Sequence, residues 1–218
     1  MKDRKNSKAT DDRFHFQSSI LHSRFCLHLC LSVFICGSFF SVKAAEIWHP
    51  KRAPLMTRWA ADVSPTNVWP EYPRPQLVRS NWLNLNGLWD YVVTPDSVDQ
   101  LPSKFAGKIL VPFPIESALS GVMTNFDEHS KLWYRRDFSV SQTWRGQRVR
   151  LHFGAVDWRC EVWVNGREIG QHQGGYDAFT FDITDALNWN GANEISVCVT
   201  DPTEGDQPRG KQSRKPEG

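Results

Sequence analysis

The pair Asn165-Gly166 stands between two stretches in which apolar and polar side chains alternate. Residues 158–164 (WRCEVWV) lead up to the pair, and residues 167–172 follow it directly. A two-residue turn of type I′ needs a positive φ at both central positions, which asparagine and glycine adopt at low cost. The pattern therefore predicts a β-hairpin at this point of the chain.

The same alternation recurs in other short segments, and no amphipathic helix of useful length accompanies it. In residues 147–153 charged or imidazole side chains alternate with apolar ones. This pattern predicts a strand with one buried face and one solvent-exposed face. Further strands are predicted at residues 87–93, 108–111, 132–140, 178–183 and 194–200, with a short helical turn at 185–189. Seven or eight short strands between glycine- and proline-containing turns indicate an all-β fold, a β-sandwich.

The first 44 residues have the pattern of a targeting segment. A basic stretch precedes an apolar run at residues 26–42, and small or modest side chains follow it up to Ala44. We predict a signal peptide that is cut near Ala44, hence an exported protein that keeps no membrane attachment. An uncleaved N-terminal anchor is the alternative, because the run lies at the lower limit of a membrane span.

Two cysteines remain after this segment, Cys160 and Cys198. Cys160 lies on the apolar face predicted for residues 158–164. Cys198 lies on the face opposite to Ile195, Val197 and Val199. If the two strands share one sheet, the sulfurs point to opposite sides and cannot form a disulfide. We therefore predict two free thiols.

Residues 45–80 are rich in proline and tryptophan, including Trp48, Trp59 and Trp69. Proline lacks the backbone donor that a sheet interior needs, so this segment is predicted to be an extended lead-in. Its aromatic side chains are expected to lie on the outside of the domain that follows. The formal net charge of the whole chain is only +2, which gives no reason to expect nucleic acid as a partner.

Five segments, in this order and spacing, resemble the N-terminal sugar-binding domain of glycoside hydrolase family 2, which includes β-galactosidases, β-glucuronidases and β-mannosidases. They are NLNGLWDY (84–91), VPFPIES (111–117), LWYRRDF (132–138), HFGAVDWRCEVWVNGREIGQHQGGYDAFTFDIT (152–184) and NEISVCVTDPTEGDQPRGKQ (193–212). The resemblance implies a jelly-roll (galactose-binding-like) β-sandwich. It divides the chain into a signal peptide or anchor (1–44), the lead-in (45–80), the sandwich (81–202) and a tail toward a further domain (203–218).

The resemblance also implies that the catalytic machinery lies elsewhere. In that family an immunoglobulin-like domain and a (β/α)₈ barrel follow, and two barrel glutamates carry out retaining hydrolysis. A barrel needs about 250 residues, so it cannot be contained in this chain. We expect no catalytic residue, metal or cofactor here, and no hydrolysis by the chain alone.

Five residues are candidates for contact with substrate, again by resemblance. The loop 117–131 carries Asn125 and Asp127, and the tail 201–212 carries Asp201, Asp206 and Arg209. The alternative is that the loop is simply solvated and the tail is a charged linker.

Other residues that invite a catalytic or lectin-like interpretation have simpler structural explanations. Asp182 and Asp185 bracket Thr184 in a turn, where aspartate caps backbone N–H groups. Trp158 alternates with the apolar residues of its strand and is predicted to be in the core. Trp163 is expected to cover a neighbouring element or to contact a following domain.

Two functions remain open from the sequence. The chain is either the N-terminal domain of an exported family 2 glycosidase, with carbohydrate as partner through the full-length enzyme, or a stand-alone carbohydrate-binding or adhesion module without catalysis. A non-functional gene remnant is a third interpretation.

Overall fold

The computed structural model describes residues 48–69 and 79–202, and strands dominate these residues. In chain order the strands are β1 (Gly87–Pro95), β2 (Gly107–Val111), β3 (Ser130–Phe138), β4 (Arg150–Phe153), β5 (Arg159–Val164), β6 (Arg167–Gln173), β7 (Phe179–Asp182) and β8 (Asn193–Thr200). The helical elements are four short 3₁₀ turns, η1 (Arg58–Asp62), η3 (Ala118–Ser120), η4 (Gln142–Trp144) and η5 (Thr184–Ala186). Among these residues no α-helix occurs, and no helix is long and apolar enough to cross a membrane.

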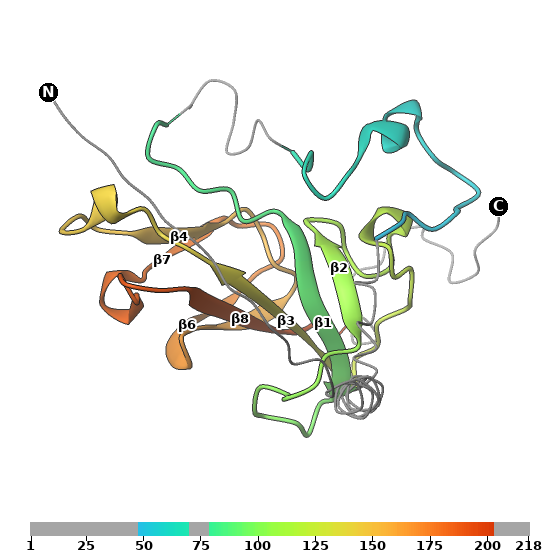
Figure 1. Cartoon of the computed structure of the whole chain (residues 1–218). Coiled ribbons are helices and arrows are strands. Elements are labelled where there is room, and N and C mark those ends of the chain that lie inside the picture. Colours follow the sequence, from blue (N-terminus) through green and yellow to red (C-terminus); the bar gives the residue numbers. More distant parts are fainter. Residues whose placement is uncertain (1–47, 70–78, 203–218) are drawn as a thin grey trace, which may run out of the picture. The chain divides into compact units, whose positions relative to one another are not determined.

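The strands form two antiparallel sheets of unequal width (Figure 1). The large sheet has six strands in the order β2-β1-β3-β8-β5-β6, and the small sheet pairs β4 with β7. Apolar side chains from both sheets meet in one core, with Ile195 and Val162 from the large sheet and Leu151 from the small one. The predicted all-β sandwich is confirmed.

The predicted hairpin is confirmed as well. β5 and β6 pair through Asn165 and Gly166, whose φ angles are 52° and 74°. The Asn165 side chain also fixes the turn to its surroundings, because Nδ2 donates to the Ala186 carbonyl at 2.7 Å and Oδ1 accepts from the Glu194 N–H at 2.9 Å. The short helical turn predicted at 185–189 occurs slightly earlier, as η5.

The two cysteines are free and buried, as predicted. Cys160 faces Val199 across the sheet, whereas Cys198 faces Glu161, so the two sulfurs lie on opposite sides of the same sheet. Burial raises the pKa of Cys160 to about 11 and that of Cys198 to about 12, so both thiols are protonated near neutral pH.

The prediction that Trp158 lies in the core is wrong. Its side chain is 40% exposed, because β5 begins only at Arg159 and Trp158 belongs to the preceding loop. Its backbone still joins the neighbouring segments, since its N–H donates to Thr200 and its carbonyl accepts from Gly174. Trp163, in contrast, covers a neighbouring strand as expected: its ring stacks on Trp133 with 5.6 Å between centroids.

The lead-in contacts the sandwich through two of its three tryptophans, Trp48 and Trp69. Trp48 donates from Nε1 to the Ser120 carbonyl at 3.1 Å, and its ring lies where a side chain at Gly121 would be. Trp69 is 54% exposed, but it lines the cavity between the sheets and its carbonyl accepts from Asn84 Nδ2 at 3.3 Å. Trp59 is 61% exposed, so the expectation that all three would pack on the domain is wrong for Trp59.

Candidate functional site

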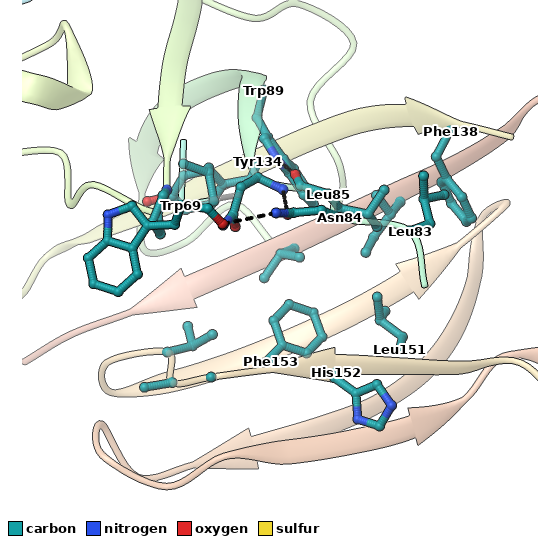
Figure 2. A pocket seen from close by; sticks show the side chains of 18 of the residues that line it. Trp69, Leu83, Asn84, Leu85, Trp89, Tyr134, Phe138, Leu151, His152 and Phe153 are labelled. Atoms are coloured by element: carbon teal, nitrogen blue, oxygen red, sulfur yellow. Dashed lines mark hydrogen bonds between the residues drawn. The ribbon is translucent and has the colours of Figure 1, made fainter. Parts of the chain in front are cut away.

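A cavity of about 910 Å³ lies between the two sheets, and most of its walls are apolar and aromatic. Trp89, Tyr134 and Phe138 line it from the large sheet, and Leu151 and Phe153 line it from β4 (Figure 2). These residues point into it because each occupies an inward position of its strand, where alternation turns every second side chain toward the opposite layer. The cavity is therefore continuous with the hydrophobic core.

Three carboxylates line the same cavity and come from three separate loops. Glu116 follows β2, Asp157 precedes β5 and Asp201 follows β8. The Asp157 carboxylate occupies the space that a side chain at Gly175 would need, so glycine permits its position. The Tyr134 hydroxyl belongs to the same environment, because burial, with a smaller contribution from the Glu116 charge, raises its pKa.

Asp201 is the member of this group whose ionisation is most clearly perturbed. Burial raises the pKa of its carboxyl above the ordinary value, and the negative charges of Asp157 and Glu116 raise it further. A carboxylate held in this way is easier to protonate than one in water. The chemistry that such a group offers is hydrogen bonding to a hydroxyl or attraction of a cation.

This shift predicts a pH-dependent effect of the substitution Asp201→Asn. A raised pKa in the folded state means that the ionised carboxylate opposes folding at neutral pH, and that this cost is absent below the ordinary pKa of 3.8. We therefore expect Asp201→Asn to raise Tm at pH 7, and the difference from the parent chain to vanish below about pH 3.8. Thermal unfolding between pH 3 and pH 8 measures it.

The substitution Asp182→Asn is a control, because the opposite change in Tm is expected for it. The Thr184 hydroxyl and N–H both donate to Asp182 Oδ1, at 2.5 and 3.0 Å, and these bonds lower the pKa of that carboxyl. Its contribution to stability is present above the ordinary pKa and is lost as the pH falls through the lowered one. Asp182→Asn should therefore lower Tm at pH 7. A lowered Tm for Asp201→Asn, or a raised Tm for Asp182→Asn, would contradict the assignment for that residue.

The loop candidates from the sequence do not join this group. Asn125 and Asp127 are exposed, and neither lines the cavity. Asp127 instead closes its own turn, because Oδ1 accepts the His129 N–H at 3.1 Å. Phe126, which lies between them, points the other way and lines the cavity.

Of the tail candidates, only Asp201 lies in the described part of the chain, and it does line the cavity. Asp206 and Arg209 lie outside the described residues. Glu116 and Asp157 were missed from the sequence, since single acidic residues in unrelated loops carry no spacing signal. Within residues 48–69 and 79–202 no group of three metal-ligating side chains comes together.

Comparison with known proteins assigns the chain to a family. The family model for "Glycosyl hydrolases family 2, sugar binding domain" matches residues 92–207. A β-galactosidase of Bacteroides ovatus is 34% identical over 126 residues, which cover 58% of this chain and 13% of that protein. A β-glucuronidase of Paenibacillus borealis is 28% identical over 134 residues, which cover 59% of this chain and 22% of that protein.

Among solved structures, β-glucuronidase of Faecalibacterium prausnitzii is similar to 55% of this chain and 20% of its own, with a TM-score of 0.47 and 29% identity. The chain thus spans less than a quarter of the length of these relatives. Because the family model covers more than half of the 218 residues, the chain belongs to glycosyl hydrolase family 2 and contains its sugar-binding domain.

Proposed function

We propose that the chain is the N-terminal part of an exported family 2 glycosidase that hydrolyses β-glycosidic bonds. The match of the sugar-binding domain to residues 92–207 carries this proposal. The curated relatives that share this segment are named β-galactosidase and β-glucuronidase and are at least four times longer than the shared part. The catalytic carboxylates would then lie in polypeptide that follows residue 218.

In this proposal the domain acts as a scaffold. A sandwich held by a six-stranded sheet is a rigid support, and the loops at one end of such a support are suited to form a wall of a neighbouring active site. The end that carries Glu116, Asp157 and Asp201 is the best candidate for that wall, because it combines carboxylates with exposed aromatic side chains. Trp158 is 40% exposed and Tyr176 is 95% exposed, and their segments are joined by the Gly174–Trp158 hydrogen bond at 2.8 Å.

The proposal is tested by comparing two proteins. One is the 218-residue chain, and the other is the protein translated from the gene through its natural stop codon, which we call the full reading-frame product. With p-nitrophenyl β-D-galactopyranoside and β-D-glucuronide, we expect saturable hydrolysis by the full reading-frame product and none above buffer by the 218-residue chain. Enzymatic rate enhancements of at least about 10⁶ make this difference unambiguous. Saturable hydrolysis by the 218-residue chain would contradict the proposal.

Export and cleavage of the leader are tested by a separate measurement. N-terminal sequencing of the protein recovered outside the cytoplasm should begin near residue 45 if the leader is cleaved. Recovery of the intact N-terminus in the membrane fraction would favour an anchor instead.

The exposed Trp158 and Tyr176 favour the alternative of a carbohydrate-binding module as a second candidate, because aromatic faces stack on sugar rings. Affinity electrophoresis of the 218-residue chain in gels that contain soluble polysaccharide distinguishes the two. Retardation that Trp158→Ala abolishes would support a binding module, whereas unchanged mobility in all gels would favour the scaffold.

A further inference from the structure

Three Asn-Gly pairs occur in the chain, Asn86-Gly87, Asn165-Gly166 and Asn190-Gly191. An asparagine that precedes glycine can react with its own backbone, because the glycine nitrogen can attack the side-chain amide carbon and close a five-membered ring. Glycine favours this intramolecular step, since it has no Cβ to hinder the approach and lets the main chain rotate. The sequence makes the three pairs equal candidates, so the fold decides which of them reacts.

The pair Asn165-Gly166 is held by hydrogen bonds on both atoms of the asparagine amide. Asn165 Nδ2 donates to the Ala186 carbonyl at 2.7 Å and to Asn193 Oδ1 at 2.8 Å. Its Oδ1 accepts from the Glu194 N–H at 2.9 Å, and its own N–H donates to the Glu194 carbonyl at 2.8 Å. The amide can turn toward the Gly166 nitrogen only if several of these bonds break, at about 1 kcal/mol each.

The pair Asn86-Gly87 is held through its main chain. The Asn86 N–H donates to Asn84 Oδ1 at 2.8 Å, and its carbonyl accepts from Arg136 Nη1 at 2.9 Å. Gly87 is buried and begins β1, where it pairs with Val111 of β2. A Cβ at Gly87 would lie 3.0 Å from Arg136 Nη1, so the surroundings leave this backbone little room to rotate.

The pair Asn190-Gly191 lies in the loop between η5 and β8, and both of its residues are exposed. The Asn190 N–H donates to Asn188 Oδ1 at 3.1 Å. Within the described residues no hydrogen bond uses the Gly191 N–H or Asn190 Nδ2. The nitrogen that would attack and the amide group that would leave are therefore both free to move.

A guanidinium group contacts the amide oxygen of this third pair. Arg145 follows η4, and its Nη2 donates to Asn190 Oδ1 at 3.3 Å. During the attack the amide carbon becomes tetrahedral and its oxygen takes up negative charge. A cationic donor directed at that oxygen stabilises this charge, so Arg145 is placed to favour the reaction.

We propose that Asn190 is a site of spontaneous deamidation and that Arg145 accelerates the reaction. The Gly191 nitrogen loses its proton and bonds to Asn190 Cγ, the bond from Cγ to Nδ2 breaks, and ammonia leaves. Water then opens the ring at either carbonyl carbon, which yields aspartate if the new bond to nitrogen breaks and isoaspartate if the original peptide bond breaks. The net change is uptake of one water and release of one ammonia, and the loop gains a negative charge. This inference is independent of the proposed function.

Peptide mapping of the folded 218-residue chain during incubation at pH 8 tests the site. Cleavage after lysine and arginine places the three pairs on separate peptides, 80–104, 160–167 and 168–209. We expect conversion at Asn190 to be at least about tenfold faster than at Asn86 and Asn165, because each hydrogen bond that must open slows the reaction. Both aspartate and isoaspartate should form at position 190. Equal conversion of the three pairs, or aspartate alone at position 190, would overturn the proposal.

The isolated peptides are the control for the contribution of the fold. Once cut from the chain, the three pairs should convert at similar rates, because the hydrogen bonds that protect Asn86 and Asn165 are gone. If Asn190 kept its full advantage in the isolated peptides, the advantage would come from its sequence neighbours, and the inference from the fold would be wrong.

A pair of arginine variants tests the role of the guanidinium. Arg145→Met should slow the conversion of Asn190 about threefold, a modest effect because the contact is exposed to solvent. Arg148→Met is the matched control, since Arg148 is exposed as well and its Nε lies 3.8 Å from Asp182 Oδ2 instead. It should leave the conversion rate unchanged. An unchanged rate for Arg145→Met, or equal slowing by both variants, would contradict the role assigned to Arg145.

Discussion

Replacing Trp133 with alanine is expected to lower the free energy of unfolding by about 3–5 kcal/mol, the range for removing a large aromatic side chain from a packed interior. Trp133 is 1% exposed and lies on the face of the large sheet away from the core between the layers. Its ring stacks on Trp163, and its Nε1 donates to Thr94 Oγ1 at 3.1 Å. The substitution removes packing and also leaves the Thr94 hydroxyl without this donor.

Urea unfolding followed by circular dichroism measures the loss, with Trp59→Ala as the matched control. Trp59 is 61% exposed and contacts the Arg58 guanidinium, 4.6 Å above its ring, so its removal should cost about 0.5 kcal/mol or less. Trp133→Phe keeps most of the ring and should cost less than Trp133→Ala, which keeps the experiment informative if the alanine variant does not fold. Equal losses for the Trp133 and Trp59 alanine variants would show that packing of Trp133 on the outer face of the large sheet does not stabilise the domain.

The strands were predictable because their signal is local. A period of two in β5 and β8 and the Asn165-Gly166 turn depend only on neighbouring residues, and tertiary packing did not override them. Trp158 shows where this reasoning fails. Its alternation with the strand residues is real, but the sequence does not reveal that β5 begins one residue later, at Arg159.

The site was far less predictable than the fold. Glu116, Asp157 and Asp201 come together only because three loops end at the same side of the sandwich, and no spacing in the sequence encodes that meeting. Asn125 and Asp127 could be named from the sequence because their residue types suit sugar binding. Their positions are nevertheless exposed, because the apolar Phe126 takes the inward place. Burial of one side chain in a loop decides which of its neighbours can reach a site.

Asn193 is the second residue whose replacement is expected to lower the free energy of unfolding strongly. It is 1% exposed, and its side chain makes three hydrogen bonds that close the loop between η5 and β8. Its Oδ1 accepts from the Asn188 N–H at 2.6 Å and from Asn165 Nδ2 at 2.8 Å, and its Nδ2 donates to the Asn188 carbonyl at 3.1 Å. Through Asn165 the same network reaches the hairpin turn, so one amide connects segments that are far apart in sequence.

Asn193→Ala should therefore lower the free energy of unfolding by about 3 kcal/mol, because buried backbone and amide groups lose partners that water cannot replace. The matched control is Asn190→Ala, whose exposed side chain accepts one bond from Arg145 Nη2 at 3.3 Å and should cost about 0.5 kcal/mol or less. Urea unfolding of both variants measures the difference. If Asn193→Ala unfolds at the same urea concentration as Asn190→Ala, the network does not hold the loop, and the hairpin turn must be stabilised by its backbone conformation alone.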